Sequence, residues 1–285
     1  MPELPEVETI VRQLNRLISS KKITEIDVLN DKSFEGDYRS IINFRVNSIK
    51  RKAKTLIFYL EHDKILLIHL KMTGQLIYQE KEKRTSGGHP TKDFYDELPN
   101  KHTRVIIDFD DNSKLFFNDL RKFGWIKLTD EDGLKEYFSK YGPDAVPIID
   151  VTYLKARAKK MPRSSIKKFI LDQNVISGVG NIYADESLFE AKIHPESLVS
   201  SLSDEQWVEL AKDITEKLTF AIEKGGTTDS DYVNAYGEKG GMQDYLKVYH
   251  KDGSRCPREC GGMIEKTKVG GRGTHFCPNC QKVQR

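Results

Sequence analysis

The chain opens with Met1-Pro2-Glu3-Leu4-Pro5-Glu6-Val7-Glu8-Thr9, and this stretch decides how the rest of the sequence is interpreted. If Met1 is removed, Pro2 becomes a free secondary amine followed directly by the carboxylate of Glu3. An α-amine has a pKa of about 7.7–8.0, against about 10.4 for lysine, so it is partly unprotonated and nucleophilic at neutral pH. Its attack on a sugar aldehyde carbon gives an iminium cation that acts as an electron sink, with Glu3 in reach to move protons.

The same stretch is also a good helix start, because proline and acidic residues both suit a first turn. For an isolated Pro-Glu sequence that explanation is the better one, and the rest of the chain is needed to decide. Apolar residues follow at helical spacing and predict an amphipathic helix over residues 3–19, which would anchor the N-terminus to a core. They are Val7, Ile10, Val11, Leu14, Leu17 and Ile18.

Length and composition place the chain among ordinary soluble proteins. Its 285 residues allow two domains with a small appendage, and 38% of them are hydrophobic and 31% charged. No apolar run reaches the roughly 18 residues of a membrane span, and no basic-then-apolar leader precedes the first helix. We therefore expect a cytoplasmic protein.

The last 40 residues form a basic, cysteine-containing tail. Residues 246–285 hold nine basic and three acidic residues, a net charge of +6 where the whole chain carries +3, which suits an anionic partner such as nucleic acid. All four cysteines lie there, as Cys256-x3-Cys260 and Cys277-x2-Cys280. In a cytosolic chain such pairs predict one tetrahedral Zn²⁺ with no open position, hence a structural metal. A solvated basic tail, or disulfides in an extracellular protein, are the alternatives.

Residues 22–128 are dominated by short runs rich in β-branched and aromatic residues, separated by turn signals, which predict a sandwich or barrel. The runs are residues 23–29, 44–49, 55–60, 65–70, 105–109, 114–117 and 125–128. Residues 80–101 are polar, include Gly87-Gly88 and two prolines, and are predicted to form a long surface loop.

Residues 141–147, Tyr-Gly-Pro-Asp-Ala-Val-Pro, mark a domain boundary, after which helical spacing predicts helices over 152–160, 164–173, 183–191 and 204–224. Gly178 and Gly180 allow a tight turn into one of these helices. Backbone N–H groups there, with Asn181, can face a phosphate, although a plain capped turn explains the same residues equally well. The glycine-rich, polar residues 224–242 are predicted to be a mobile lid.

Six stretches together resemble the formamidopyrimidine-DNA glycosylases, bifunctional base-excision repair enzymes, over the whole chain. They are the opening nine residues, RKAKTL from Arg51, HLKMTG from His69, DLRKFG from Asp119, LDQNVISGVGNIYADE from Leu171 and GGRGTHFC from Gly270. The resemblance implies an α+β, multidomain fold. Residues 1–140 would form an N-terminal catalytic β-sandwich with flanking helices, 141–245 a helix–two-turns–helix DNA-binding domain, and 246–285 a β-hairpin zinc finger.

The resemblance also implies an activity: removal of oxidised purines such as 8-oxoguanine and formamidopyrimidines from double-stranded DNA, then β,δ-elimination at the abasic site. Pro2 would attack C1′ to form the Schiff base and Glu3 would act as acid/base. Lys54 would contact the lesion or its phosphates and donate a proton. Arg272 would clamp a phosphate and assist the second elimination. Without the resemblance, Lys54 and Arg272 are solvated charges.

The remaining implied sites contact DNA. A damaged base must be extruded from the duplex before it can be reached, and Met72, Arg121 and Phe123 would fill the space that it leaves. Asn181 would join Arg272 on the flanking phosphates, with Lys71 and His102 as further phosphate contacts. Without the resemblance, Met72 and Phe123 would be interpreted as core residues, and His102 would be interpreted as a solvated loop histidine. The zinc ligands would be Cys256, Cys260, Cys277 and Cys280. A monomer is the simplest expectation for a clamp on one duplex.

Three features depart from the family pattern: the Cys-x3-Cys pair where Cys-x2-Cys is usual, the length of residues 80–101, and the acids at 229–231. They leave the fine base preference open. An endonuclease VIII-like enzyme for oxidised pyrimidines is the nearest rival, although that group usually begins Pro-Glu-Gly-Pro-Glu and this chain has Leu4. A non-catalytic lesion binder of the same fold and a zinc-ribbon adaptor are the others.

Overall fold

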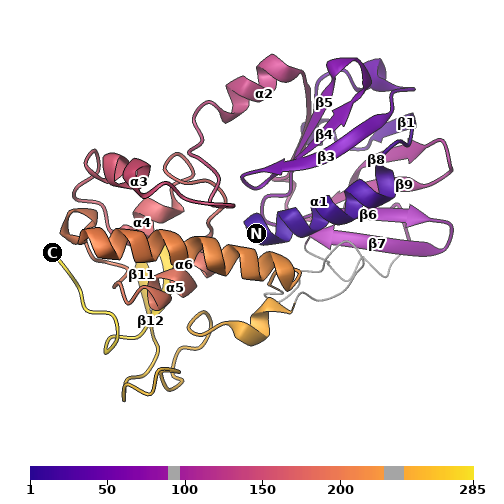
Figure 1. Ribbon diagram of the computed structural model, residues 1–285. Helices are drawn as coiled ribbons and strands as arrows, with labels where there is room; N and C mark the ends of the chain where they lie inside the picture. Colours follow the sequence, from indigo (N-terminus) through magenta and orange to yellow (C-terminus); the bar gives the residue numbers. More distant parts are fainter. Residues whose placement is uncertain (89–96, 228–240) are drawn as a thin grey trace. The chain divides into compact units, whose positions relative to one another are not determined.

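The computed structural model describes residues 1–88, 97–227 and 241–285, and the chain divides into two compact units (Figure 1). The first unit comprises Met1–Lys140 with Ile222–Gln243, and the second Tyr141–Ala221 with Asp244–Arg285. The described residues 222–227 and 241–243 thus group with the N-terminal unit, and the three-domain division stays a proposal. Within the described ranges, no helix is both long and apolar enough to cross a membrane.

Helix α1 (Leu4–Ile18) begins the first unit and confirms the helix predicted over residues 3–19. Glu3 is its N-cap, and the Glu6 carboxylate three residues later accepts a 2.8 Å hydrogen bond from the Glu3 backbone N–H. The Glu3 side chain in turn accepts from the backbone N–H of Glu6, so the two residues form a complete capping box, which satisfies donors that the helix itself cannot pair. The apolar stripe, with Val7, Ile10 and Leu14, is buried.

Two five-stranded sheets make up most of the first unit and form the predicted sandwich (Figure 1). One sheet has the order β1-β8-β9-β6-β7 and the other β2-β10-β5-β4-β3; only the β2–β10 pair is parallel among the described pairs. The strands are β1 (Ile23–Val28), β2 (Phe34–Glu35), β3 (Val46–Lys52), β4 (Thr55–Leu60), β5 (Ile65–His69), β6 (Gly74–Glu80), β7 (Lys83–Gly88), β8 (Thr103–Phe109), β9 (Lys114–Asp119) and β10 (Trp125–Thr129). Helix α2 (Glu131–Phe138), which the sequence analysis does not predict, follows β10.

The core of this unit lies where alternate strand residues of both sheets meet α1. Strand β8 shows the alternation: Val105 and Ile107 enter the main core, whereas Ile106 joins a small separate cluster with Ile77 and Phe116. Side chains two apart on a strand share a face, so the β-branched runs in the sequence translate directly into one buried surface per sheet.

The prediction of a loop over residues 80–101 is wrong for residues 83–88, which form strand β7 paired antiparallel with β6. One of the two glycines that indicate a loop serves packing instead: a Cβ on Gly87 would lie 2.6 Å from Cγ1 of Ile10, so β7 passes too close to α1 for a side chain at that position. Residues 89–96 lie outside the described residues. So do residues 228–240, which include most of the predicted lid and the acids at 229–231.

The second unit is helical and carries the C-terminal hairpin. Its helices, close to the four predicted ranges, are α3 (Val151–Ala158), α4 (Ile166–Leu171), α5 (Asn181–Glu190) and α6 (Asp204–Glu223), whose last two residues belong to the first unit. Short 3₁₀ turns occur in both units. They are η1 (Asp31–Ser33), η2 (Tyr38–Ile41) and η3 (Glu61–Asp63) in the first unit, and η5 (Val199–Ser201) and η6 (Met242–Tyr245) later in the chain. Phe169 of α4 meets Trp207 of α6 edge to face at 5.7 Å between ring centroids.

Strands β11 (Glu265–Val269) and β12 (Arg272–Phe276) form the hairpin. Gly270 and Gly271 join them with φ of 56° and 80°, the conformation that a tight two-residue hairpin turn requires at both central positions. Phe189 of α5 packs against Val248, Ile264 and two of the cysteines in one apolar cluster. The hairpin and the helices therefore form one compact unit.

Candidate functional site

Pro2 and Glu3 lie at the start of α1, and both are buried. Glu6 organises this end of the helix. One of its carboxylate oxygens accepts from the Glu3 N–H, and the other accepts a 2.8 Å hydrogen bond from the backbone N–H of Thr227. Glu6 itself is 2% exposed, so its charge is compensated by these donors inside the unit. The arrangement fixes the backbone that presents the proline.

Lys54 lies on the turn between β3 and β4, and an arginine holds that turn to α1. Arg51 donates from Nε to Oε2 of Glu8 at 2.9 Å and from Nη1 to the carbonyl of Ala53 at 2.9 Å. Burial acts to raise the pKa of Glu8, but the hydrogen bond from Arg12 and the charge of Arg51 outweigh it and leave that pKa below its ordinary value. Glu8 thus stays ionised, and Lys54, which is 6% exposed, is held near the first turns of α1.

His69, at the end of β5, shapes the loop that carries Lys71 and Met72. Its Nδ1 accepts a 3.0 Å hydrogen bond from the Lys71 N–H, and Lys71 has φ of 50°, in the left-handed region. Burial first, and then the positive charges of Lys71 and Lys54, lower the pKa of His69 to about 3. The ring is therefore neutral at physiological pH, and the accepting Nδ1 places its proton on Nε2.

The structure brings Met72, Arg121 and Phe123 to one edge of a sheet. Strands β6 and β9 are paired with Gly74 opposite Asp119, so the loops at these two strand ends are adjacent. All three side chains are exposed, Met72 by 37% and Phe123 by 53%, and the Arg121 guanidinium lies 4.7 Å from the centroid of the Phe123 ring. Large apolar side chains exposed at a loop tip are available for contact with a partner.

His102 belongs to the same edge. Its carbonyl accepts a 2.9 Å hydrogen bond from the Asp119 N–H, and its own N–H donates to Oδ1 of Asn100 at 2.9 Å. Three neighbouring loops therefore carry five of the predicted DNA contacts: Lys71, Met72, His102, Arg121 and Phe123.

In the second unit, Asn181 and Arg272 are brought together by the hairpin. Asn181 is the first residue of α5, after Gly180 at the N-cap, and its Nδ2 donates to the carbonyl of Gly273 at 3.0 Å. Arg272 is exposed beside that carbonyl and lines an open cavity of about 220 Å³ together with Lys168. The cavity is also lined by Asp172, and its two cations, Lys168 and Arg272, suit an anionic group such as a phosphate.

A buried ion pair ties the hairpin to the helices. The side chains of Lys167 and Asp185 are both fully buried, and their Nζ and Oδ1 lie 2.6 Å apart. Lys167 Nζ also donates to the carbonyl of Gly273 at 3.0 Å and to the hydroxyl of Thr274 at 2.8 Å. Asp185 Oδ2 in turn accepts from the N–H of His275 at 2.9 Å. The residues next to Arg272 are therefore anchored from α4 and α5.

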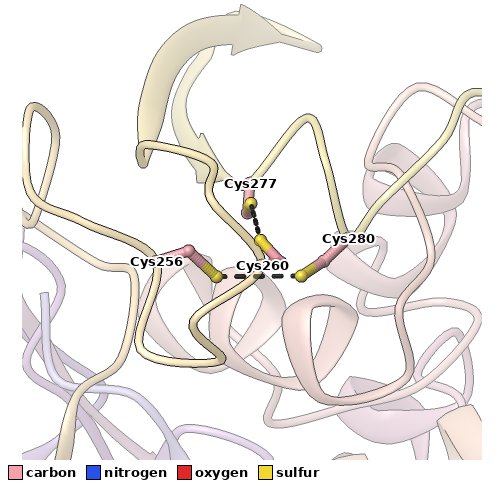
Figure 2. A group of neighbouring side chains, drawn as sticks. All are labelled: Cys256, Cys260, Cys277 and Cys280. Atoms are coloured by element: carbon pink, nitrogen blue, oxygen red, sulfur yellow. Dashed lines mark hydrogen bonds between the residues drawn. The ribbon is translucent and has the colours of Figure 1, made fainter.

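The four cysteines converge on one point between the hairpin and the preceding loop (Figure 2). Their sulfur atoms all lie within 4.8 Å of one another, with Cys256–Cys280 at 3.7 Å and Cys260–Cys277 at 3.6 Å. Four thiolates at a Zn–S distance of about 2.3 Å in a tetrahedron lie about 3.8 Å apart, so this donor set fits a zinc ion. All four positions are filled by protein, which makes the metal structural.

Several residues on which these sites depend are not predicted from the sequence. Glu6 could have been found from its position three residues after an N-cap, the capping-box spacing. Lys167 and Lys168 are adjacent in sequence, yet one is fully buried and the other exposed, and no local signal separates them. Asp119 begins the DLRKFG stretch, but its sequence context does not predict a function for its side chain.

Comparison with known proteins identifies the family. The model of the formamidopyrimidine-DNA glycosylase N-terminal domain matches residues 1–126, and that of the H2TH domain of the same glycosylase matches residues 142–232. A zinc finger found in FPG and IleRS matches residues 253–283. The three matches follow one another along the chain and cover most of it.

Full-length relatives agree. The chain is 40% identical to the formamidopyrimidine-DNA glycosylase of Streptococcus pneumoniae over 99% of both proteins. It superposes with a TM-score of 0.87 on the Lactococcus lactis Fpg in complex with abasic-site DNA, at 34% identity over 99% of this chain and 100% of the other. A variant of that Fpg bound to Fapy-dG DNA gives a TM-score of 0.87 at 35% identity, with the same coverage. The chain belongs to the formamidopyrimidine-DNA glycosylase family.

Proposed function

We propose that this protein is a bifunctional DNA glycosylase of base-excision repair, which removes oxidised purines from double-stranded DNA and cleaves the strand at the resulting abasic site. The observation that carries the proposal is the start of α1, where Pro2 and Glu3 are buried and the Glu6 carboxylate holds the backbone N–H of Glu3. That start belongs to a chain that matches the family along its whole length. The Lactococcus lactis relatives are seen with abasic-site and Fapy-dG DNA, which sets the substrate class.

The proposed chemistry begins after loss of Met1. The Pro2 nitrogen forms a bond to C1′ while the bond from C1′ to the damaged base breaks, and the base leaves with a proton. Opening of the sugar ring gives an iminium cation, which withdraws electrons and acidifies the C2′ proton. Loss of that proton expels the 3′ phosphate, and a second elimination expels the 5′ phosphate. Glu3 moves protons at the sugar, while Lys54 donates a proton in the elimination.

Six further residues would hold the DNA in the extruded state. Met72 and Phe123 would wedge into the space left by the base, and Arg121 would pair with the widowed base opposite, since its guanidinium donates in a planar fork. Lys71, His102 and Asn181 would contact phosphates. We call Met72, Arg121 and Phe123 the wedge residues. Their exposure at one sheet edge supports this assignment.

Cys256, Cys260, Cys277 and Cys280 would hold one Zn²⁺, which supplies no reaction step and fixes the fold of the module that carries β11 and β12. Arg272 sits at the exposed end of that hairpin and would bind a phosphate beside the lesion. It would also assist the second elimination. The relatives named above are bacterial, and an enzyme that acts on DNA in such a cell would work in the cytoplasm, on the nucleoid; this supports a cytoplasmic location.

Borohydride trapping tests this proposal, because it reduces an iminium to a stable amine and so links the enzyme covalently to its DNA. The protein is mixed with a duplex containing 8-oxoguanine opposite cytosine, or with one containing an oxidised pyrimidine, and the linked residue is mapped by mass spectrometry. A link at Pro2 with the purine duplex is the expected result, and Pro2→Gly should lose most strand cleavage while it still binds the lesion.

Two outcomes would contradict the proposal in different ways. A Pro2 link formed only with the pyrimidine duplex would keep the mechanism and move the substrate to the endonuclease VIII class. Lesion binding without any link would instead identify a non-catalytic binder.

A further inference from the structure

Asp119 is a buried carboxylate that the proposed reaction does not use. It is the last residue of β9 and is 1% exposed. Directly after it the chain leaves the sheet and carries Leu120, Arg121 and Phe123, all exposed. A buried carboxylate needs compensating hydrogen bonds, because its desolvation is otherwise costly. The identity of its donors therefore shows what Asp119 holds in place.

Within the part of the chain that the structure describes, the donors to this carboxylate come from the two loops that carry Met72, Arg121 and Phe123. Oδ2 accepts from the N–H of Gly124 at 2.6 Å, and Oδ1 accepts from the N–H of Arg121 at 3.1 Å. Oδ1 also accepts a short hydrogen bond from the hydroxyl of Thr73, the residue after Met72. The Thr73 hydroxyl oxygen in turn accepts from the Arg121 N–H at 3.0 Å. One carboxylate thus binds both ends of the 121–124 turn and the neighbouring loop.

The backbone around Asp119 is held equally firmly. Its N–H donates to the carbonyl of His102 at 2.9 Å, and its carbonyl accepts from Nε of Arg104 at 2.9 Å. At the far end of the turn, a Cβ on Gly124 would lie 2.7 Å from Cζ of Phe117 and 3.1 Å from Oδ2 of Asp119. The turn is therefore pressed onto the carboxylate, and a larger residue there would push it away.

The wedge side chains depend on this support because the core does not hold them. Met72 and Phe123 are exposed by 37% and 53%, and Arg121 and Phe123 contact each other. Each loop also contains a residue in the left-handed region, Lys71 with φ of 50° and Lys122 with φ of 58°. Such backbone persists only where surrounding contacts determine it.

We infer that Asp119 is a positioning residue, whose carboxylate, together with the Thr73 hydroxyl, holds the Met72 loop and the Arg121–Phe123 turn in the geometry that enters the duplex. This inference rests on the proposed function. An ionised carboxylate only accepts hydrogen bonds and so satisfies three donors at once. An Asn in its place would turn an N–H₂ group toward one of those donors, and the loops would then have to order during insertion.

The inference predicts a selective defect. Asp119→Asn and Thr73→Val should each slow single-turnover removal of 8-oxoguanine from a duplex by about ten- to a hundredfold, the scale of a misplacement near 1 Å. Both should reduce the fluorescence rise of a 2-aminopurine placed beside the lesion, and both should weaken the discrimination between cytosine and adenine opposite it. Thr73→Ser, which keeps the hydroxyl, should restore all three readouts.

Two controls separate positioning from general damage. Borohydride trapping on a single-stranded abasic oligonucleotide needs no wedge, and Asp119→Asn should leave it within about twofold, because the reacting groups are at Pro2. Asp110 lies in the turn between β8 and β9, at the opposite end of β9 from Asp119, and its exposed carboxylate accepts from the Lys22 N–H at 3.0 Å. Asp110→Asn should therefore match the wild type in every assay.

The inference would be overturned if Asp119→Asn and Thr73→Val removed 8-oxoguanine from a duplex at the wild-type rate and kept the wild-type discrimination between opposite bases. An equal loss of single-strand trapping, or the same loss in Asp110→Asn, would also overturn it, since either would show general destabilisation. If Asp119→Asn does not fold, the Thr73→Val and Thr73→Ser pair decides alone. A wild type that forms no link at all would refute the proposed function instead, so the two failures are distinguishable.

Discussion

Replacing His69 with Asn should remove a large part of the acid sensitivity of the first unit. His69 is 8% exposed, and its pKa is lowered to about 3 by burial and then by the charges of Lys71 and Lys54. Asn is the matched substitution because its Oδ1 occupies the position of the ring Nδ1. It can therefore still accept from the Lys71 N–H, the bond that is 3.0 Å long in the wild type.

The magnitude follows from proton linkage. An unfolded histidine has a pKa near 6.5, so between that pH and about 3 the unfolded chain binds a proton that the folded one does not. The stability that the neutral, buried ring contributes is fully present above pH 6.5. Below that pH the free energy of unfolding falls by about 1.4 kcal/mol per pH unit. From pH 7 to about pH 5 the wild type should lose about 2 kcal/mol through this residue, and His69→Asn should not.

Trp125 provides the assay, because its ring centroid lies 5.8 Å from that of His69 and the chain has only one other tryptophan, Trp207. In a Trp207→Phe background, urea unfolding followed by fluorescence reports the first unit at each pH. His62→Asn, which removes an exposed histidine of the same unit, should keep the wild-type pH dependence. An unchanged pH dependence in His69→Asn would refute the reasoning, and so would a ring titration by NMR near pH 6.5.

Three further changes test the packing and the metal site. Cys277→Ser should release zinc, measured by elemental analysis, and weaken binding to all DNA with a shallower salt dependence; unchanged affinity would show that the finger makes no phosphate contacts. Lys167→Met should lower the unfolding free energy of the second unit by about 3–5 kcal/mol, followed by Trp207 fluorescence, because it strands the Asp185 charge; a loss under about 1 kcal/mol would contradict this. Gly87→Ala should cost about 1–3 kcal/mol in urea unfolding through overpacking against Ile10, and wild-type stability would place β7 farther from α1.

Local periodicity accounts for most of what the sequence predicts correctly. Helix α1 and strands such as β4 and β5 follow patterns that lie within a few residues of one another, and each element buries the face that its pattern indicates. The cysteine spacing is equally local, since each pair needs only a tight turn, and the four sulfur atoms do converge.

What the sequence does not predict depends on contacts between distant segments. The sequence of strand β7 resembles a loop because the close approach of α1, more than 70 residues earlier in the chain, leaves no room for a side chain at Gly87. Asp119 acquires its role only when β6 pairs with β9 and brings Thr73 alongside. Likewise, Lys167 and Lys168 differ because one faces Asp185 on another helix. None of these relationships has a period along the sequence.

The Cys-x3-Cys pair shows how a departure from a family pattern is accommodated. The sulfur–sulfur distances of 3.6 and 3.7 Å are close to those of a tetrahedral zinc site, so the donor set with the longer knuckle still fits a zinc ion. Within it, Glu259 has φ of 54°, and Arg258 turns toward α5. Arg258 Nη2 donates to the carbonyl of Glu190 at 2.9 Å and to its Oε2 at 3.2 Å, and the guanidinium lies 4.6 Å from the centroid of the Phe189 ring.

Glu190 is suited to receive that arginine. Burial acts to raise its pKa, but hydrogen bonds from Lys247 and Lys217 outweigh it and lower the pKa to about 2, so the carboxylate stays charged at every pH at which zinc thiolates persist. The knuckle is thus fastened to the end of α5, whose first residue, Asn181, binds the hairpin at Gly273. Because both ends of one helix hold the zinc module, the position of Arg272 relative to Asn181 depends on α5 as much as on the metal.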